Sequence, residues 1–264
     1  MPEITTAMVK ALREQTGQGM MDCKKALQEA GGDIEAARDI LRKKGLVTAE
    51  TKAGRATAEG LVAIRVSPDG TSAAMVEIQC ETDFCARNDV FRQMADDVAA
   101  MALACGDGPV EATEAMKEAV VAALSKIGEN MSYARGVKIS APRIGTYVHH
   151  NRKVGVVVGL AGEISDEALA DLCMHVAFAD PMGITKDDVP ADLVEKEKKL
   201  AREQALESGK PPQIVEKIVS GKVSKFLSSH ALIEQQFVRD DKKKVKNVLG
   251  GATVQAFARF AVGT

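Results

Sequence analysis

Aromatic residues are scarce in this chain of 264 residues: they make up 3% of the sequence, and Trp is missing. A hydrophobic content of 45% is still sufficient for the packed cores of one large or two small domains. No apolar run approaches the ~20 residues that a membrane-spanning helix needs. We therefore expect a protein without membrane contact, in which an outward-facing aromatic ring would suggest an anchor for a partner.

Neither sign of charge is in excess. Lys and Arg total 35 against 37 Asp and Glu, which gives a formal net charge of -2. Phosphate binding needs a concentrated basic face, so this balance argues against nucleic acid as the principal partner. Residues 1–10 are polar and amphipathic, which does not fit a secretory signal peptide. We expect a cytoplasmic protein.

The cysteines follow no disulfide or metal pattern. Their number is odd and they are scattered, which predicts reduced thiols. Cys80 and Cys85 have four residues between them, so they form neither a Cys-x-x-Cys redox pair nor a zinc knuckle. An inert, partly buried thiol is the favoured interpretation of Cys85. A thiol enzyme that uses Cys80 or Cys85 is an alternative that would need an activated thiolate.

Motifs for nucleotide and metal chemistry are also missing. There is no Gly-x-x-x-x-Gly-Lys-Ser/Thr loop and no Gly-x-Gly-x-x-Gly after a strand, so we expect no direct nucleotide binding and no cofactor. His149 and His150 lack acidic or sulfur-bearing neighbours, and adjacent strand positions face opposite ways, so no metal site is expected. No Ser/His/Asp trio stands in a motif context. These absences favour a binding role, and we expect no enzyme.

Helix signals fill the first 45 residues. Three helices are expected: from Thr5 or Thr6 to Gly17, Met20 to Ala30, and Ile34 to Lys44 after an Asp33 cap. Gly45 is expected to be the C-cap of the third helix. The segment 47–58, rich in Ala, Lys and Thr, then predicts a linker or a loosely attached helix.

Two related α+β subdomains are predicted next. In the first, Leu61–Val66 turns back as Ser72–Gln79, and helices follow over Val90–Leu103 and roughly Ala112–Ile127. The order hairpin, loop, helix recurs over residues 144–179. The final run, Ala252–Val262, is expected to complete the second sheet.

A helical hairpin is predicted to interrupt the second subdomain. Leu193–Leu206 and Ile214–Leu227 are charged and helical, and the sequence 208–212 forces a reversal between them. A narrow apolar seam is expected between the two arms, from Leu193, Leu200, Ala201, Ile214, Ile218 and Phe226.

A short loop between the first hairpin and its helix contains Thr82, Asp83 and Phe84 and is a candidate binding site. Burying Phe84 would require desolvation of the adjacent carboxylate, which favours an outward ring on a rigid platform. The alternative is that Phe84 packs under the following helix and Asp83 only caps that helix.

Two motifs carry a resemblance to a known family. Thr82-Asp83-Phe84 after an Ile-Gln-Cys-Glu strand is similar to the TDF signature of the elongation factor Ts family. The run LREQTGQGMMDCKKAL at residues 12–27 resembles a second and more specific signature of that family. Order and spacing agree, and similarity extends over essentially the whole chain. The resemblance implies a guanine-nucleotide exchange factor for the translational GTPase elongation factor Tu.

The resemblance also implies which residues contact the partner. The exchange lever, which would intrude near the Mg²⁺ site of the partner, maps to Thr82, Asp83, Phe84 and Cys85, the last of which is more often Val in the family. Further contacts map to Arg13, Met20, Met21 and His149. From the residues alone, each Met could instead be core, Arg13 could be a solvated charge, and His150 could replace His149.

Further departures limit what the resemblance implies. Ser228-Ser229-His230 stands where acidic residues are common in the family, so a homodimer through the helical hairpin is left open. The sequence given ends at Thr264, without the additional C-terminal helix that some members carry, so the resemblance does not imply the contacts made by that helix.

The predicted class is α+β. The expected order is a three-helix module at 1–46 that resembles ubiquitin-associated modules, a linker at 47–58, a subdomain at 59–140, and a second subdomain at 141–264 interrupted by the helical hairpin at 190–230. The alternative function is an adaptor or chaperone cofactor that recognises a protein without affecting nucleotide exchange.

Overall fold

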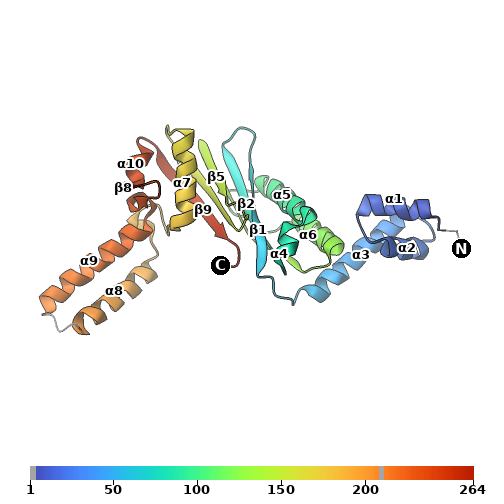
Figure 1. Ribbon diagram of the computed structural model, residues 1–264, viewed down its shortest axis with the longest axis horizontal. Helices are drawn as coiled ribbons and strands as arrows, with labels where there is room; N and C mark the ends of the chain where they lie inside the picture. Colours follow the sequence, from blue (N-terminus) through green and yellow to red (C-terminus); the bar gives the residue numbers. More distant parts are fainter. Residues whose placement is uncertain (1–3, 208–210) are drawn as a thin grey trace.

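The computed structural model describes residues 4–207 and 211–264 of the chain. A helical module at one end, a body with two sheets, and a projecting helical hairpin at the other end follow one another along the long axis (Figure 1). The predicted α+β class is confirmed. Part of the predicted reversal, Ser208 to Lys210, lies outside the described residues.

The module consists of two short helices and the first half of a third. Its elements are α1 (Thr6–Thr16), α2 (Met20–Glu29) and α3 (Ile34–Lys52). Thr5 caps α1 by accepting the Met8 N–H at 3.3 Å, and Gly17 ends α1 in the left-handed region with φ 67°. Leu12, Cys23 and Leu27 lie in the centre of the bundle, which explains the apolar spacing of its helices.

The third helix is longer than predicted. We expected Gly45 to end it, but α3 continues to Lys52, and Gly45 is buried within the helix. The predicted linker at 47–58 is thus helical in its first half. The error arose because a glycine followed by an Ala- and Lys-rich stretch is equally compatible with a C-cap and with close packing of a continuing helix.

The first sheet has the strand order β1-β2-β4-β3. Its strands are β1 (Glu59–Val66), β2 (Ser72–Cys80), β3 (Gly108–Pro109) and β4 (Met131–Ser140). The β1–β2 hairpin was predicted, whereas β3 and β4 were not. Helices α5 (Asp89–Leu103) and α6 (Glu114–Ile127) contribute Phe91, Val98 and Leu124 to the core on one face of this sheet.

The second sheet has the order β5-β6-β9. Its strands are β5 (Arg143–Val148), β6 (Val154–Ala161) and β9 (Thr253–Ala261), so the predicted final strand is confirmed. Helix α7 (Asp166–Ala179), capped by Ser165, packs on it through Leu172 and Val176. Four short elements complete this subdomain: η1 (Lys186–Asp188), η2 (Leu232–Glu234), the β7–β8 hairpin (Gln236–Phe237 and Asp240–Lys244) and α10 (Val245–Leu249).

The two sheets pack against each other through their inner faces. Val62 and Met75 of the first sheet share a buried cluster with Val157 and Phe260 of the second. Arg152, in the turn before β6, accepts the Val62 N–H at 2.7 Å with its backbone carbonyl and pairs with Asp96 through its side chain. The body therefore has four layers, helices, sheet, sheet and helix, and the two subdomains share a buried apolar interface.

The helical hairpin is formed by α8 (Ala191–Glu207) and α9 (Pro212–His230), and its seam agrees with the prediction in part, at Ala201 and Ile218. The buried seam consists of Ala201, Ala205, Val215 and Val219. Leu200 and Ile214, which we expected in it, are 49% and 46% exposed. The small residues let the arms approach closely, which single-helix periodicity does not reveal. None of the described helices combines the length and the hydropathy that a bilayer crossing requires.

Candidate protein-binding site

Phe84 lies on α4 (Asp83–Arg87), a short helix between β2 and α5. It is 78% exposed, so the prediction of an outward ring is confirmed and the alternative, a ring packed under α5, is wrong. The predicted loop is a helix instead. Thr82 is its N-cap, because the Thr82 hydroxyl accepts the Cys85 N–H at 3.2 Å.

A carboxylate from a distant part of the chain holds Thr82. Glu129, which follows α6, accepts the Thr82 backbone N–H at 3.1 Å and the Thr82 hydroxyl at 2.9 Å. The neighbouring Glu81 carboxylate accepts the Asn130 backbone N–H at 2.5 Å. These reciprocal bonds tie the segment before α4 to the segment before β4, so the backbone that carries Phe84 has little freedom.

Two buried thiols lie at the start of this segment: Cys80 ends β2 and Cys85 belongs to α4. Cys80 and Cys85 are both buried, and the Cys80 thiol donates to the Thr82 carbonyl at 3.2 Å. The hydrogen bond with Cys85 and burial raise the pKa of the Cys80 thiol, which contradicts an activated thiolate at Cys80. Within residues 4–207 and 211–264, no group of three or more His, Cys, Asp or Glu side chains is arranged to hold a metal ion.

Asp83 points its carboxylate at a neighbour on the same helix. It pairs with Arg87 at 3.0 Å, and the two side chains are 44% and 71% exposed. A solvent-exposed pair of this kind is worth ~0–1 kcal/mol. Asp83 can therefore exchange Arg87 for a hydrogen-bond donor of a partner at little cost in free energy.

The predicted contact residues of the N-terminal module are all at its surface. Met20 and Met21 begin α2 and are 55% and 62% exposed, so both lie outside the module core. Arg13 lies in the last turn of α1 with an exposed side chain. Exposed, flexible Met side chains suit a protein interface. This surface belongs to a different part of the molecule from Phe84, and α3 connects the two (Figure 1).

His149 lies directly after β5 in the second subdomain and is half-buried. Its Nδ1 is 2.7 Å from the Tyr147 hydroxyl, and its ring centroid is 4.3 Å from that of His150. The expectation that the two imidazoles face opposite ways is wrong, because both follow the end of the strand, where strand alternation no longer applies. His149 lines a surface hollow of about 570 Å³, whereas His150 is exposed.

Sequence reasoning missed two residues that matter here. Glu129, the clamp on Thr82, gave no signal, because a carboxylate between a helix and an unpredicted strand has no local pattern. Phe178 lines the same hollow as His149 and is 80% exposed. Its signal was available: Leu172 and Val176 mark the buried stripe of α7, and Phe178 falls on the opposite side of that helix.

Exposed apolar side chains on a rigid scaffold are typical of surfaces that bind other proteins. The fold and the site thus define the class as an α+β protein with exposed apolar side chains on several parts of its surface.

The particular family follows from comparison with known proteins. The family model for Elongation factor TS matches residues 81–264. Elongation factor Ts of Methylococcus capsulatus is 47% identical, with 98% of this chain and 92% of the relative covered. The protein of the same name from Hydrogenovibrio crunogenus is 46% identical, with 98% of this chain and 92% of the relative covered. The one from Aquifex aeolicus is 41% identical, with 97% of this chain and 96% of the relative covered. The chain belongs to the elongation factor Ts family, and this membership supports a role as a translation elongation factor.

Proposed function

We propose that the chain is a guanine-nucleotide exchange factor that binds elongation factor Tu in its GDP form and promotes release of GDP. The observation that carries the proposal is the exposed Phe84 on a helix whose N-cap is clamped by Glu129. An exposed phenylalanine is unfavourable in water unless a partner covers it, and a rigid support lets the ring exert force on that partner.

The mechanism is a coupling between two binding events. A GTPase holds GDP through Mg²⁺ and through backbone amides around the phosphates. The binding energy of this chain weakens those contacts when Phe84 enters an apolar crevice and shifts a helix of the partner. Asp83 leaves Arg87 and competes for hydrogen bonds that support the Mg²⁺ shell. Linkage then requires GDP to weaken binding of this chain by the same factor.

The remaining contacts enlarge the interface. Arg13, Met20 and Met21 contact the partner from the module, and His149 contacts it from the second subdomain. Contacts spread over three regions suit a factor that must hold its partner without nucleotide. On this proposal the chain acts in the cytoplasm, binds no nucleotide, needs no cofactor and catalyses no covalent reaction. Self-association through the helical hairpin would be an additional property.

Binding measurements with and without GDP test the proposal against the adaptor alternative. We expect titration calorimetry to give a lower dissociation constant with nucleotide-free elongation factor Tu than with the GDP-saturated protein. Equal dissociation constants in the two states would support an adaptor or chaperone cofactor instead, because a ligand with equal affinity for both states cannot shift the equilibrium between them.

A further inference from the structure

Helix α3 belongs to both the module and the body. Its first half contributes Ala37 and Leu41 to the module core. Its second half runs beside α6, and Ala49 packs against the core of the first subdomain. Figure 1 shows α3 as the connection between the module and the helices that cover the first sheet. The angle of α3 against α6 therefore sets the position of the module.

Gly45 is a point of close approach between these two helices. It is buried, and a methyl group at this position would overlap the Ser125 Oγ and lie 3.7 Å from the Val121 Cγ1. Glycine within a helix is destabilising by roughly 0.5–1 kcal/mol relative to alanine, so helix formation does not account for it. The absence of a side chain lets α3 pack directly on α6.

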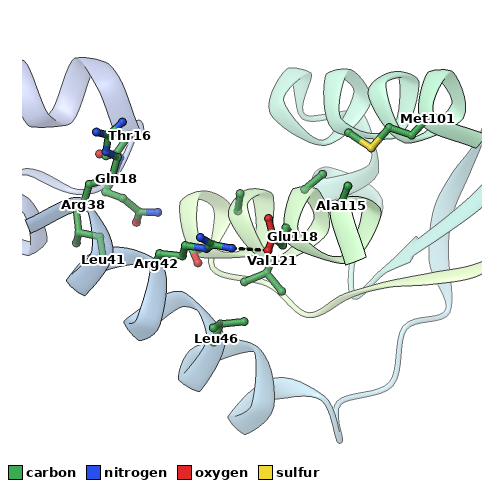
Figure 2. Close-up of a pocket in the computed structure, with 13 residues that line it drawn as sticks. Thr16, Gln18, Arg38, Leu41, Arg42, Leu46, Met101, Ala115, Glu118 and Val121 are labelled. Atoms are coloured by element: carbon green, nitrogen blue, oxygen red, sulfur yellow. Dashed lines mark hydrogen bonds and ion pairs between the residues drawn. The ribbon is translucent and has the colours of Figure 1, made fainter. Parts of the chain in front are cut away.

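Exposed polar contacts join α3 to α6 and its C-cap on both sides of Gly45. Arg42 pairs with Glu118 of α6 across a hollow of about 510 Å³ (Figure 2). Towards the end of α3, the Lys52 ammonium donates to the carbonyl of Gly128. Gly128 directly precedes Glu129, the clamp on Thr82, so the contact continues to the support of Phe84.

We propose that Gly45 is a positioning residue: by letting α3 pack on α6, it fixes the module with Met20 and Met21 and the support of Phe84 as one rigid body. The consequence for exchange rests on the proposed function. When Met20 and Met21 have bound the partner, Phe84 is already in position for its own contact, so less conformational freedom is lost on binding.

Gly45→Leu tests the rigid connection in the full chain. The new side chain collides with α6, whereas Lys43→Leu adds the same side chain on the opposite, exposed face of α3. Spin labels at Gln15→Cys and Ala100→Cys, with Cys105→Ser, report the separation of module and body by pulsed electron resonance. We expect one narrow distance distribution for the unaltered chain and for Lys43→Leu, and a broad or shifted one for Gly45→Leu. A broad distribution in the unaltered chain would overturn the proposal.

A functional measurement separates positioning from general damage to the fold. In GDP release from elongation factor Tu, Gly45→Leu should raise the half-saturating concentration by about tenfold and leave the plateau rate within about twofold. Met20→Ala with Met21→Ala should weaken the unaltered chain more than it weakens Gly45→Leu, because the loosened module contributes less. Equal penalties in both backgrounds would contradict the proposal.

Two further controls keep every outcome informative. If Gly45→Leu loses helical content in circular dichroism, Gly45→Ala takes its place. Its methyl collides with the Ser125 Oγ alone, so adding Ser125→Ala must restore both the distance and the half-saturating concentration. Failure of this rescue would count against Gly45 as a positioning residue. If the unaltered chain does not accelerate GDP release, the proposed function fails, while the distance measurement still tests the rigid connection.

Discussion

Replacing Phe84 by alanine is the perturbation that separates the proposed lever from its scaffold. The ring is 78% exposed, so its removal takes little packing from the free protein. We expect the free energy of unfolding to change by less than about 0.5 kcal/mol, as for other surface substitutions. Any effect on nucleotide release must then come from the contact with the partner.

The size of the effect follows from the area that Phe84 still has to bury. Complete burial of a phenylalanine side chain contributes about 1.5–3 kcal/mol. With 78% of the residue exposed in the free protein, most of this contribution remains to be gained on binding. We therefore expect Phe84→Ala to weaken binding to nucleotide-free elongation factor Tu by ~2 kcal/mol, which corresponds to roughly 30-fold in the dissociation constant.

Stopped-flow release of fluorescent GDP is the assay, with the concentration of this chain varied through saturation. Phe84→Ala should lower the plateau rate, because the wedge acts while the diphosphate pocket opens. Phe178→Ala is a control for the loss of binding area alone, since Phe178 is 80% exposed beside His149 on the other subdomain: it can raise the half-saturating concentration but should leave the plateau rate unchanged. A plateau at the wild-type rate for Phe84→Ala, or an equal fall for both variants, would refute the reasoning.

Three further predictions follow from the contacts of the described residues. Glu129→Ala should lower the plateau rate of GDP release several-fold, because it removes the hydrogen bonds that hold Thr82. Glu129→Gln should lower the plateau rate less. Equal plateau rates for the unaltered chain and both variants would contradict the role of Glu129 as a clamp. Burial lowers the pKa of His175 from its ordinary value of 6.5. Below about pH 6.5 the imidazole of the unfolded chain therefore takes up a proton that the folded chain does not bind. The free energy of unfolding should fall as the pH drops below about 6.5. Urea unfolding at about pH 7.5 and about pH 5.5 should show this loss, and His175→Asn should reduce it; an unchanged pH dependence in the variant would exclude His175 as its source. Iodoacetamide at neutral pH should modify half-exposed Cys105 in the folded protein and should reach Cys80 and Cys85 only after unfolding. Rapid modification of Cys80 in the folded protein, detected by peptide mapping, would contradict its burial and its raised pKa.

Much of the fold was accessible from the sequence because its signals are local. The Thr5 cap and the hairpin that joins β1 to β2 were placed within a residue or two of their observed positions. These features depend on side chains that contact their own backbone neighbours, so the pattern alone is sufficient. The outward orientation of Phe84 was predicted for a similar reason, since the adjacent Asp83 disfavours burial.

The features that were missed depend on contacts between distant residues. Strand β4 pairs with β2 across more than 50 residues, and its buried positions are interrupted by half-buried ones, so it lacked a clear alternation. Helix α3 continues through Gly45 because α6 packs against it, which no feature of the segment itself reveals. For the same reason, Glu129 could not be assigned to Thr82 before the tertiary structure placed the two together.

The most direct measurement is the rate of GDP release from elongation factor Tu as the concentration of the unaltered chain increases. The account predicts that the observed rate rises with concentration and reaches a plateau well above the spontaneous rate. A rate equal to the spontaneous one at every concentration, in samples where complex formation is confirmed by light scattering, would contradict the claim that Phe84 and its rigid support open the nucleotide site.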